Sequence, residues 1–279
     1  MPTTYALTWD EVGERLYETG DKNGVLYVYD NTAKKYNNGV AWSGLTAVTE
    51  SPSGAEETAL WADDIKYLSL RSAEQFGGTI EAYMFPPEWG ACDGSATIAA
   101  GVNIGQQTRS MFAFVYKSII GNDTVGNDYG YKIHVIYGAT ASTSQRSYAT
   151  VNESPEAITF SWEFTTVPVN VPGFKPTSIV TVESTTADPT GLAKLEAALF
   201  GSDGGDTYTA ADTTSGFEAN IIYFERTGTG TEESPYVYTA TTATTPAVGT
   251  TYYTNGAQTP HLLMPEEIAD LFTSNVGNG

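Results

Sequence analysis

Residues 157–165, AITFSWEFT, decide the fold class. Every second side chain of this stretch is apolar: Ile158, Phe160, Trp162 and Phe164. The positions between them are polar: Thr159, Ser161, Glu163 and Thr165. Because successive side chains of a β-strand point to opposite faces of its sheet, this alternation predicts a strand with one face on a core and one face in water.

Similar strand signals occur along most of the chain. They combine β-branched and aromatic residues, which suit a pleated, half-buried surface, with turn residues at their ends. The predicted strands cover residues 24–30, 39–50, 65–71, 78–85, 110–119, 131–137 and 177–183. A Gly-, Asn- and Asp-rich connection at 121–130 separates two of them and predicts a hairpin with a long loop. The fold is therefore expected to be mainly β.

One helix is well marked at residues 188–200. Asp188 can cap its start, Pro189 suits its first turn, and Gly201 can end it. Its apolar residues recur on one face: Leu192, Leu195 and Leu199. A shorter helical piece is expected at 265–272.

The segment between the helices, residues 202–260, differs in composition, being rich in Thr, Gly, Tyr, Asp and Glu. We interpret it as an insertion with short strands at 220–225, 235–240 and 250–254. The expected organisation is a β core with its helix at 1–201, the insertion at 202–260, and a C-terminal helix and tail at 261–279 that return to the core.

The excess of acidic residues excludes a nucleic-acid-binding protein. Thirteen Lys and Arg residues face 33 Asp and Glu, for a formal net charge of −20, whereas phosphate contacts come from basic side chains. The single cysteine excludes an intramolecular disulfide. The N-terminal residues lack the basic and apolar regions of a secretory signal, and no stretch approaches the ~20 apolar residues of a membrane helix. We expect folding in a cytoplasm and no membrane partner.

No residue pattern indicates chemistry, so we expect no enzyme, no metal, no cofactor and no catalytic residue. The two histidines lie far apart, and we expect His134 to make a structural hydrogen bond within its strand. Cys92 sits in a turn-like sequence and is expected to be an inert thiol. A pair of carboxylates such as Glu81 and Glu163 suits a glycosidase, but such pairs arise freely among 33 acidic residues.

The sequence at 39–95, which begins GVAWSGLTAVTESPSGAEETALWADDIKYLSL, resembles the major tail protein family of siphophages that infect Gram-positive bacteria. The likeness covers residues 5–201 and 260–272. It includes GQQ at 105–107, the connection at 121–130, YKIHVIYG at 131–138, SPEAITFSWEFTTVPVNV at 154–171, LAKLEAALFG at 192–201 and PEEIADLF at 265–272. The 202–260 segment departs from the family pattern, and we expect it to decorate the outer wall of an assembly.

The resemblance implies a β-sandwich or barrel with one flanking helix. It implies that six subunits form a ring, that rings stack into a tail tube, and that inner strands join into a barrel of roughly 24 strands, wide enough for an aqueous channel. DNA passes through this channel without specific binding. The implied partners are further copies of the chain, a tape measure protein inside the tube, and tail terminator and baseplate or distal tail proteins at its ends. The implied location is the virion, after assembly in the host bacterial cytoplasm.

Two sets of site residues follow from combining the resemblance with the strand pattern. An acidic channel repels phosphate, so we expect polar residues of alternating strands to face the lumen: Glu81, Glu163, Thr159 and Ser161. Exposure of these residues to outer solvent is an equal alternative. We expect the acidic loop at 51–63 to bridge stacked rings, and an ordinary surface loop is the equal alternative. Its candidate residues are Ser51, Pro52, Gly54, Glu56, Glu57 and Asp63.

The second candidate function is a monomeric carbohydrate- or surface-binding β-sandwich module. Exposed aromatic rings, those of Trp42, Trp61, Trp89 or tyrosines, are suitable stacking platforms for sugars. The alternative is that these rings fill the core or a subunit interface. Self-association separates the two functions, because a tube protein must polymerise.

Overall fold

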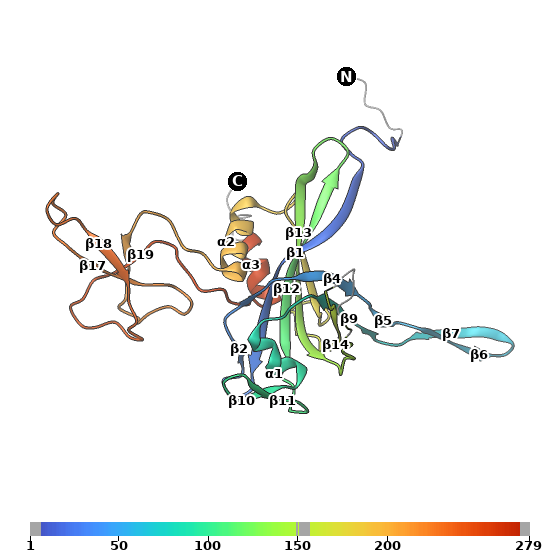
Figure 1. Cartoon of the computed structure of the whole chain (residues 1–279). Helices are drawn as coiled ribbons and strands as arrows, with labels where there is room; N and C mark the ends of the chain where they lie inside the picture. The colour runs from blue at the N-terminus through green and yellow to red at the C-terminus, as the bar shows by residue number, and fades with distance from the viewer. Residues whose placement is uncertain (1–6, 149, 151–156, 274–279) are drawn as a thin grey trace, which may run out of the picture. The chain divides into compact units, whose positions relative to one another are not determined.

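The computed structural model describes residues 7–148, 150 and 157–273. The fold is mainly β, with a large antiparallel sheet and three short helices, which confirms the predicted fold class. The chain divides into two compact units (Figure 1). The first unit comprises residues 1–36 and 40–189, and the second comprises 37–39 and 190–279.

Three long antiparallel strands form the centre of the first unit. They are β1 (Leu16–Asp30), β12 (Phe112–Asn122) and β13 (Gly126–Ala141). The sheet runs in the order β2-β1-β12-β13-β14-β9-β4, while β3 also pairs with β1 and β15 also pairs with β13. The shorter strands are β2 (Lys35–Tyr36), β3 (Val40–Trp42), β4 (Leu45–Glu50), β9 (Gly77–Ala82), β14 (Phe160–Thr166) and β15 (Ile179–Glu183).

An aromatic core packs against this sheet. The Trp42 ring lies 4.7 Å from that of Trp89 and 5.6 Å from that of Trp162, measured between centroids. Trp162 and Phe164 are buried while Glu163 between them is exposed, so the predicted alternation is confirmed. Trp89 comes from a short 3₁₀ helix, η1 (Pro87–Trp89), which leads into α1 (Gly90–Asp93).

The connection at 121–130 is not the long loop that its composition predicts. Strand β12 continues to Asn122, and β13 begins at Gly126. The side-chain oxygen of Asn122 accepts hydrogen bonds from the backbone N–H groups of Thr124 and Val125, at 3.2 and 2.6 Å. This Asx-type turn closes the hairpin within a few residues, which leaves the following Asn, Asp and Gly residues free to extend the strand.

A small hairpin of β10 (Ala96–Ala99) and β11 (Val102–Ile104) follows α1. The remaining strands of the first unit are β5 (Ser53–Gly54), β6 (Glu57–Ala62), β7 (Ile65–Arg71) and β8 (Glu74–Gln75). These four strands pair only with one another among the described residues, β5 with β8 and β6 with β7.

The second unit contains two helices and a small sheet. Helix α2 (Pro189–Phe200) confirms the predicted helix at 188–200, and α3 (Pro265–Thr273) confirms the shorter one. The helices approach closely at Gly191, where a Cβ atom would lie 2.8 Å from the carbonyl oxygen of Leu271. None of the helices in the described residues is long and apolar enough to span a membrane.

The segment expected as an insertion forms the sheet of this second unit. Its strand order is β16-β19-β17-β18. The strands are β16 (Thr209–Ala210), β17 (Phe224–Thr227), β18 (Val237–Ala240) and β19 (Tyr252–Thr254). Stacked tyrosines, such as Tyr208 and Tyr238 with centroids 3.9 Å apart, take the place of an aliphatic core. The 202–260 segment therefore shares a compact unit with both helices.

Candidate functional site

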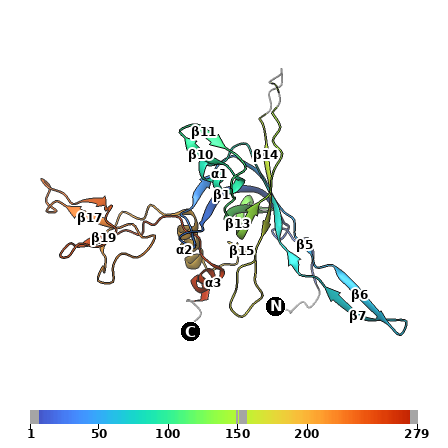
Figure 2. The same cartoon turned by 90° about the horizontal axis from the view of Figure 1, so that it is seen from below.

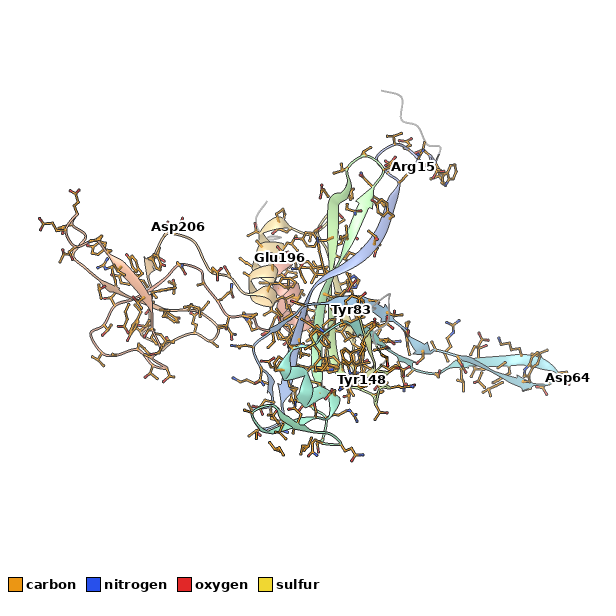
Figure 3. The ribbon with its side chains drawn as sticks, in the orientation of Figure 1. Arg15, Asp64, Tyr83, Tyr148, Glu196 and Asp206 are labelled. Atoms are coloured by element: carbon orange, nitrogen blue, oxygen red, sulfur yellow. The ribbon has the colours of Figure 1, made fainter. Side chains whose placement is uncertain are left out.

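Residues 53–75 form a two-stranded arm that projects from the rest of the first unit (Figures 1 and 2). Strands β5 and β8 pair at its base, and β6 and β7 pair along its length. Asp64 lies at its far end (Figure 3). The expected acidic loop at 51–63 is thus one side of a β-hairpin, because β-forming residues on both sides of Asp63 and Asp64 pair with each other.

The tip of the arm is a tight turn built from two aspartates. Asp63 and Asp64 have φ angles of 51° and 62°, and they connect the paired residues Ala62 and Ile65. Positive φ at both central positions is typical of a type I′ turn, whose twist matches that of the flanking strands. Aspartate tolerates this conformation better than most residues. The two carboxylates are therefore held together at the end of the arm.

The arm is amphipathic. On one face Leu60 pairs with Leu68, Thr58 with Leu70, and Ala62 with Ile65. We call Leu60, Ile65, Leu68 and Leu70 the apolar face of the arm. On the other face Glu57 accepts hydrogen bonds from the Lys66 ammonium group and, at 2.7 Å, from the Ser69 hydroxyl. The two faces thus differ in chemistry as the two faces of a core-forming sheet do.

The apolar face of the arm has no core beneath it. Leu60, Ile65, Leu68 and Leu70 are 42%, 62%, 47% and 51% exposed, and Trp61 on the other face is 69% exposed. An isolated two-stranded hairpin is marginally stable in water, and large exposed apolar patches are typical of protein contact surfaces. The candidate stacking residues Ser51, Pro52, Gly54, Glu56, Glu57 and Asp63 are all exposed on or beside this arm.

Three of the four candidate lumen residues share one face of the sheet. Ser161 on β14 pairs with Glu81 on β9, and Glu163 pairs with Thr79, all on the face opposite the core. Thr159 is exposed but precedes β14 and lies outside the ladder. We call the outward residues of β4, β9 and β14 the polar face. Its hydroxyl and carboxyl groups belong to Thr49, Thr79, Glu81, Ser161, Glu163 and Thr165.

The polar face carries no basic residue on these three fully described strands. It is therefore a surface of hydroxyl groups and carboxylates that offers no cation to a phosphate. It ends at β4, which pairs with β9 and with no other strand among the described residues. An unpaired strand edge is a ready template for pairing with another chain.

A polar network joins the end of β4, where the arm begins, to the central sheet. Glu50 Oε1 accepts a hydrogen bond of 2.7 Å from the Tyr116 hydroxyl and lies 3.2 Å from His134 Nδ1. Ser118 Oγ lies 2.9 Å from His134 Nε2, which confirms the expected structural hydrogen bond of this histidine. His134, followed by the Tyr116 hydroxyl, holds the pKa of Glu50 below its usual value against the opposing effect of burial.

The order Ser118, His134, Glu50 is that of a catalytic triad, but the surroundings of Ser118 differ from those of a nucleophile. Its backbone is paired with β1 at Asp21 and with β13 at Lys132. The ladder engages the N–H groups that an oxyanion hole requires. We assign the network a positional role, because it fixes the strand from which the arm extends.

Cys92 and two of the three candidate tryptophans lie in the interior. Cys92 is fully buried, and burial followed by the charge of Asp93 raises the pKa of its thiol to about 12, so it carries no thiolate at neutral pH. No cluster of three or more His, Cys, Asp or Glu residues suited to a metal ion occurs in the described part of the chain. Trp42 and Trp89 lie in the core, which leaves Trp61 as the exposed member of the three candidate stacking rings.

Comparison with known proteins does not assign the chain to a family. No protein-family model matches the sequence, and no curated protein matches it.

Proposed function

We propose that the protein is a structural subunit that polymerises into a tube, and that this tube is the tail tube of a long-tailed bacteriophage. The single observation that carries the proposal is the apolar face of the arm. Its leucine and isoleucine side chains are presented to water on a hairpin that cannot bury them by itself. Contact with another copy of the chain buries this face and orders the arm.

The polar face suits the wall of a channel for DNA. Its carboxylates repel phosphate, and its hydroxyl groups form hydrogen bonds with water as readily as with DNA. A duplex can therefore slide past this face without binding to it. The net charge of −20 per chain adds a long-range field of the same sign. The unpaired edge of β4 is suited to pairing between subunits, which removes the strand edges of a ring. Ring formation by six copies follows from the family resemblance.

The further partners in this proposal also follow from the resemblance. They are a tape measure protein in the lumen, and tail terminator and baseplate or distal tail proteins at the ends of the tube. The proposed location is the virion, after assembly in the cytoplasm of the host bacterium.

Electron microscopy of the purified protein at low and high concentration tests the proposal. We expect hollow rings or tubes at high concentration. Monodisperse monomers at every concentration contradict it, and they favour the second candidate, the monomeric carbohydrate-binding module with Trp61 as its stacking ring. A glycan array with a Trp61→Ala control then decides that candidate.

A second experiment tests the channel separately. Glu81→Lys with Glu163→Lys reverses two charges on the polar face, and assembled tubes of this variant are expected to hold double-stranded DNA in a salt-dependent manner. Glu225→Lys with Glu232→Lys makes the same change of charge on exposed residues of the second unit. Equal retention of DNA by the two variants contradicts a lumenal position for the polar face.

A further inference from the structure

A groove with a volume of about 800 Å³ lies at the base of the arm. One wall is the base of the arm, and the other is the segment 168–179 that follows β14. Its apolar lining includes Phe76, Pro168, Pro176 and Ile179, and its charged lining includes Arg71 and Lys175. We call this the base groove. Its size falls within the range of sites that receive a small ligand or a few side chains.

The base groove is apolar in its floor and mainly basic in its charges. Phe76 and Ile179 also pack against the core, so the floor is continuous with the interior of the first unit. Arg71 and Lys175 make no ion pair within the described residues, although the chain has far more acidic than basic groups. Among the lining residues these two cations outnumber the carboxylate of Glu74.

The lining chemistry indicates the kind of occupant. Ser178 lines the groove, but its hydroxyl oxygen is itself buried and is not accessible to an occupant. Recognition therefore rests on the apolar residues and the two cations of the lining. The groove thus suits a short segment with apolar side chains and carboxylates.

We propose that the base groove receives the arm tip, residues 61–65, of a second copy of the chain. The tip presents the carboxylates of Asp63 and Asp64 between Trp61 and Ile65, which are 69% and 62% exposed. Acidic and apolar groups of the tip thus meet basic and apolar groups of the groove. The inference rests on the proposed function, because it names the surface that accepts the arm.

The tip cannot occupy the groove of its own chain. The groove lies at the base of the same arm, and the roughly eight residues between Ala55 and Asp63 span about 26 Å as a β-strand. Folding back would break the β6–β7 ladder. The contact is therefore intermolecular and head-to-tail, which is the type of contact that builds rings or open filaments.

Cysteine cross-linking tests the contact without changing a charge. Ala62→Cys places a thiol at the tip, and Ala73→Cys, in a differently tagged chain, places one in the groove. The native Cys92 is fully buried and does not interfere. After mixing and oxidation, the yield of disulfide-linked heterodimers is expected to be at least about tenfold higher than in a control mixture. The control pairs Ala62→Cys with Val248→Cys, because Val248 is fully exposed in the second unit.

A charge variant provides an independent readout. Lys175→Glu is expected to raise the critical concentration for assembly by about tenfold, the effect of ~1.4 kcal/mol. Asp63→Asn with Asp64→Gly, which suits a type I′ turn, is expected to restore part of the assembly of that variant. The matched control is Lys194→Glu, which is the same change of charge on an exposed residue of α2.

The outcomes separate the contact from the proposed function. In one outcome, tubes form, but cross-linking does not exceed the control and Lys175→Glu has no effect on assembly. This outcome overturns the proposed contact and leaves the proposed tube function intact. Cross-linked heterodimers without tubes support the contact and contradict the tube. Absence of both tubes and cross-links overturns both.

Discussion

Assembly is expected to depend on the apolar face of the arm. The triple variant Leu60→Thr, Leu68→Thr and Leu70→Thr removes three leucines from this face and retains β-forming residues. Full burial of a leucine side chain contributes about 1.5–3 kcal/mol, and these side chains are 42%, 47% and 51% exposed. Because about half of each side chain is still exposed, contact with another copy can gain about half of that free energy per leucine. Removal of the three leucines therefore costs roughly 3 kcal/mol of association free energy for one arm. A loss of this size weakens association by about 100-fold.

The assay is the critical concentration for assembly, measured by sedimentation of polymer over a dilution series. Ile98→Thr is the matched control, because Ile98 is 64% exposed on the separate β10–β11 hairpin. The thermal unfolding midpoint of the soluble monomer should be the same for both variants and the unaltered chain, since exposed side chains contribute little to monomer stability. Assembly of the triple variant at the original critical concentration refutes the role of the arm.

The Glu50 network, the core and the arm each lead to a further prediction. The folded chain lowers the pKa of Glu50, so the ionised carboxylate stabilises the fold at a pH above its pKa in the unfolded chain. That stabilisation is lost as the pH falls through the pKa of Glu50 in the folded chain. Glu50→Gln should therefore reduce the loss of unfolding free energy below about pH 4.5, measured by urea titration at a series of pH values. An unchanged acid limb counts against the Glu50 network. Trp162→Ala should lower the free energy of unfolding by about 3–5 kcal/mol, because its ring fills the core, whereas Trp61→Ala should change it by less than about 0.5 kcal/mol. Amide hydrogen exchange in β6 and β7 should be fast in the monomer and slow in the polymer, and equal protection in both states contradicts ordering of the arm on assembly.

Strands with strict alternation were predictable from the sequence because each has a core beside it. Residues 157–165 carry the period of two along most of their length, and β14 places Trp162 and Phe164 inward as expected. The same pattern placed Ser161 and Glu163 together on one face. Their alignment with Glu81 depends on the pairing of β14 with β9, some 80 residues earlier in the chain, and local periodicity holds no information about that pairing.

Only the first side of the arm, with β5 and β6, lies in the segment expected to be a loop, since β7 coincides with the strand expected at 65–71. Loop signals at Ser51, Pro52, Ser53 and Gly54 are strong, and the two aspartates resemble the charges of a solvated loop. Residues 57–62 also lack a regular alternation of apolar and polar side chains, because Leu60, Trp61 and Ala62 follow one another. The base groove was out of reach of sequence analysis, since its walls come from segments about 100 residues apart.

The construction of the arm is consistent with the proposed function, in which one chain exists both as a monomer and in a polymer. Its base is fixed, because Glu50 at the end of β4 is bound to Tyr116 of the central sheet. Its length is weakly held, because the β6–β7 ladder has no second layer among the described residues. Association must therefore supply the free energy that orders the arm, which lowers the affinity of a single contact. In the proposed tube, many such contacts together stabilise the polymer, whereas two isolated copies are expected to separate readily.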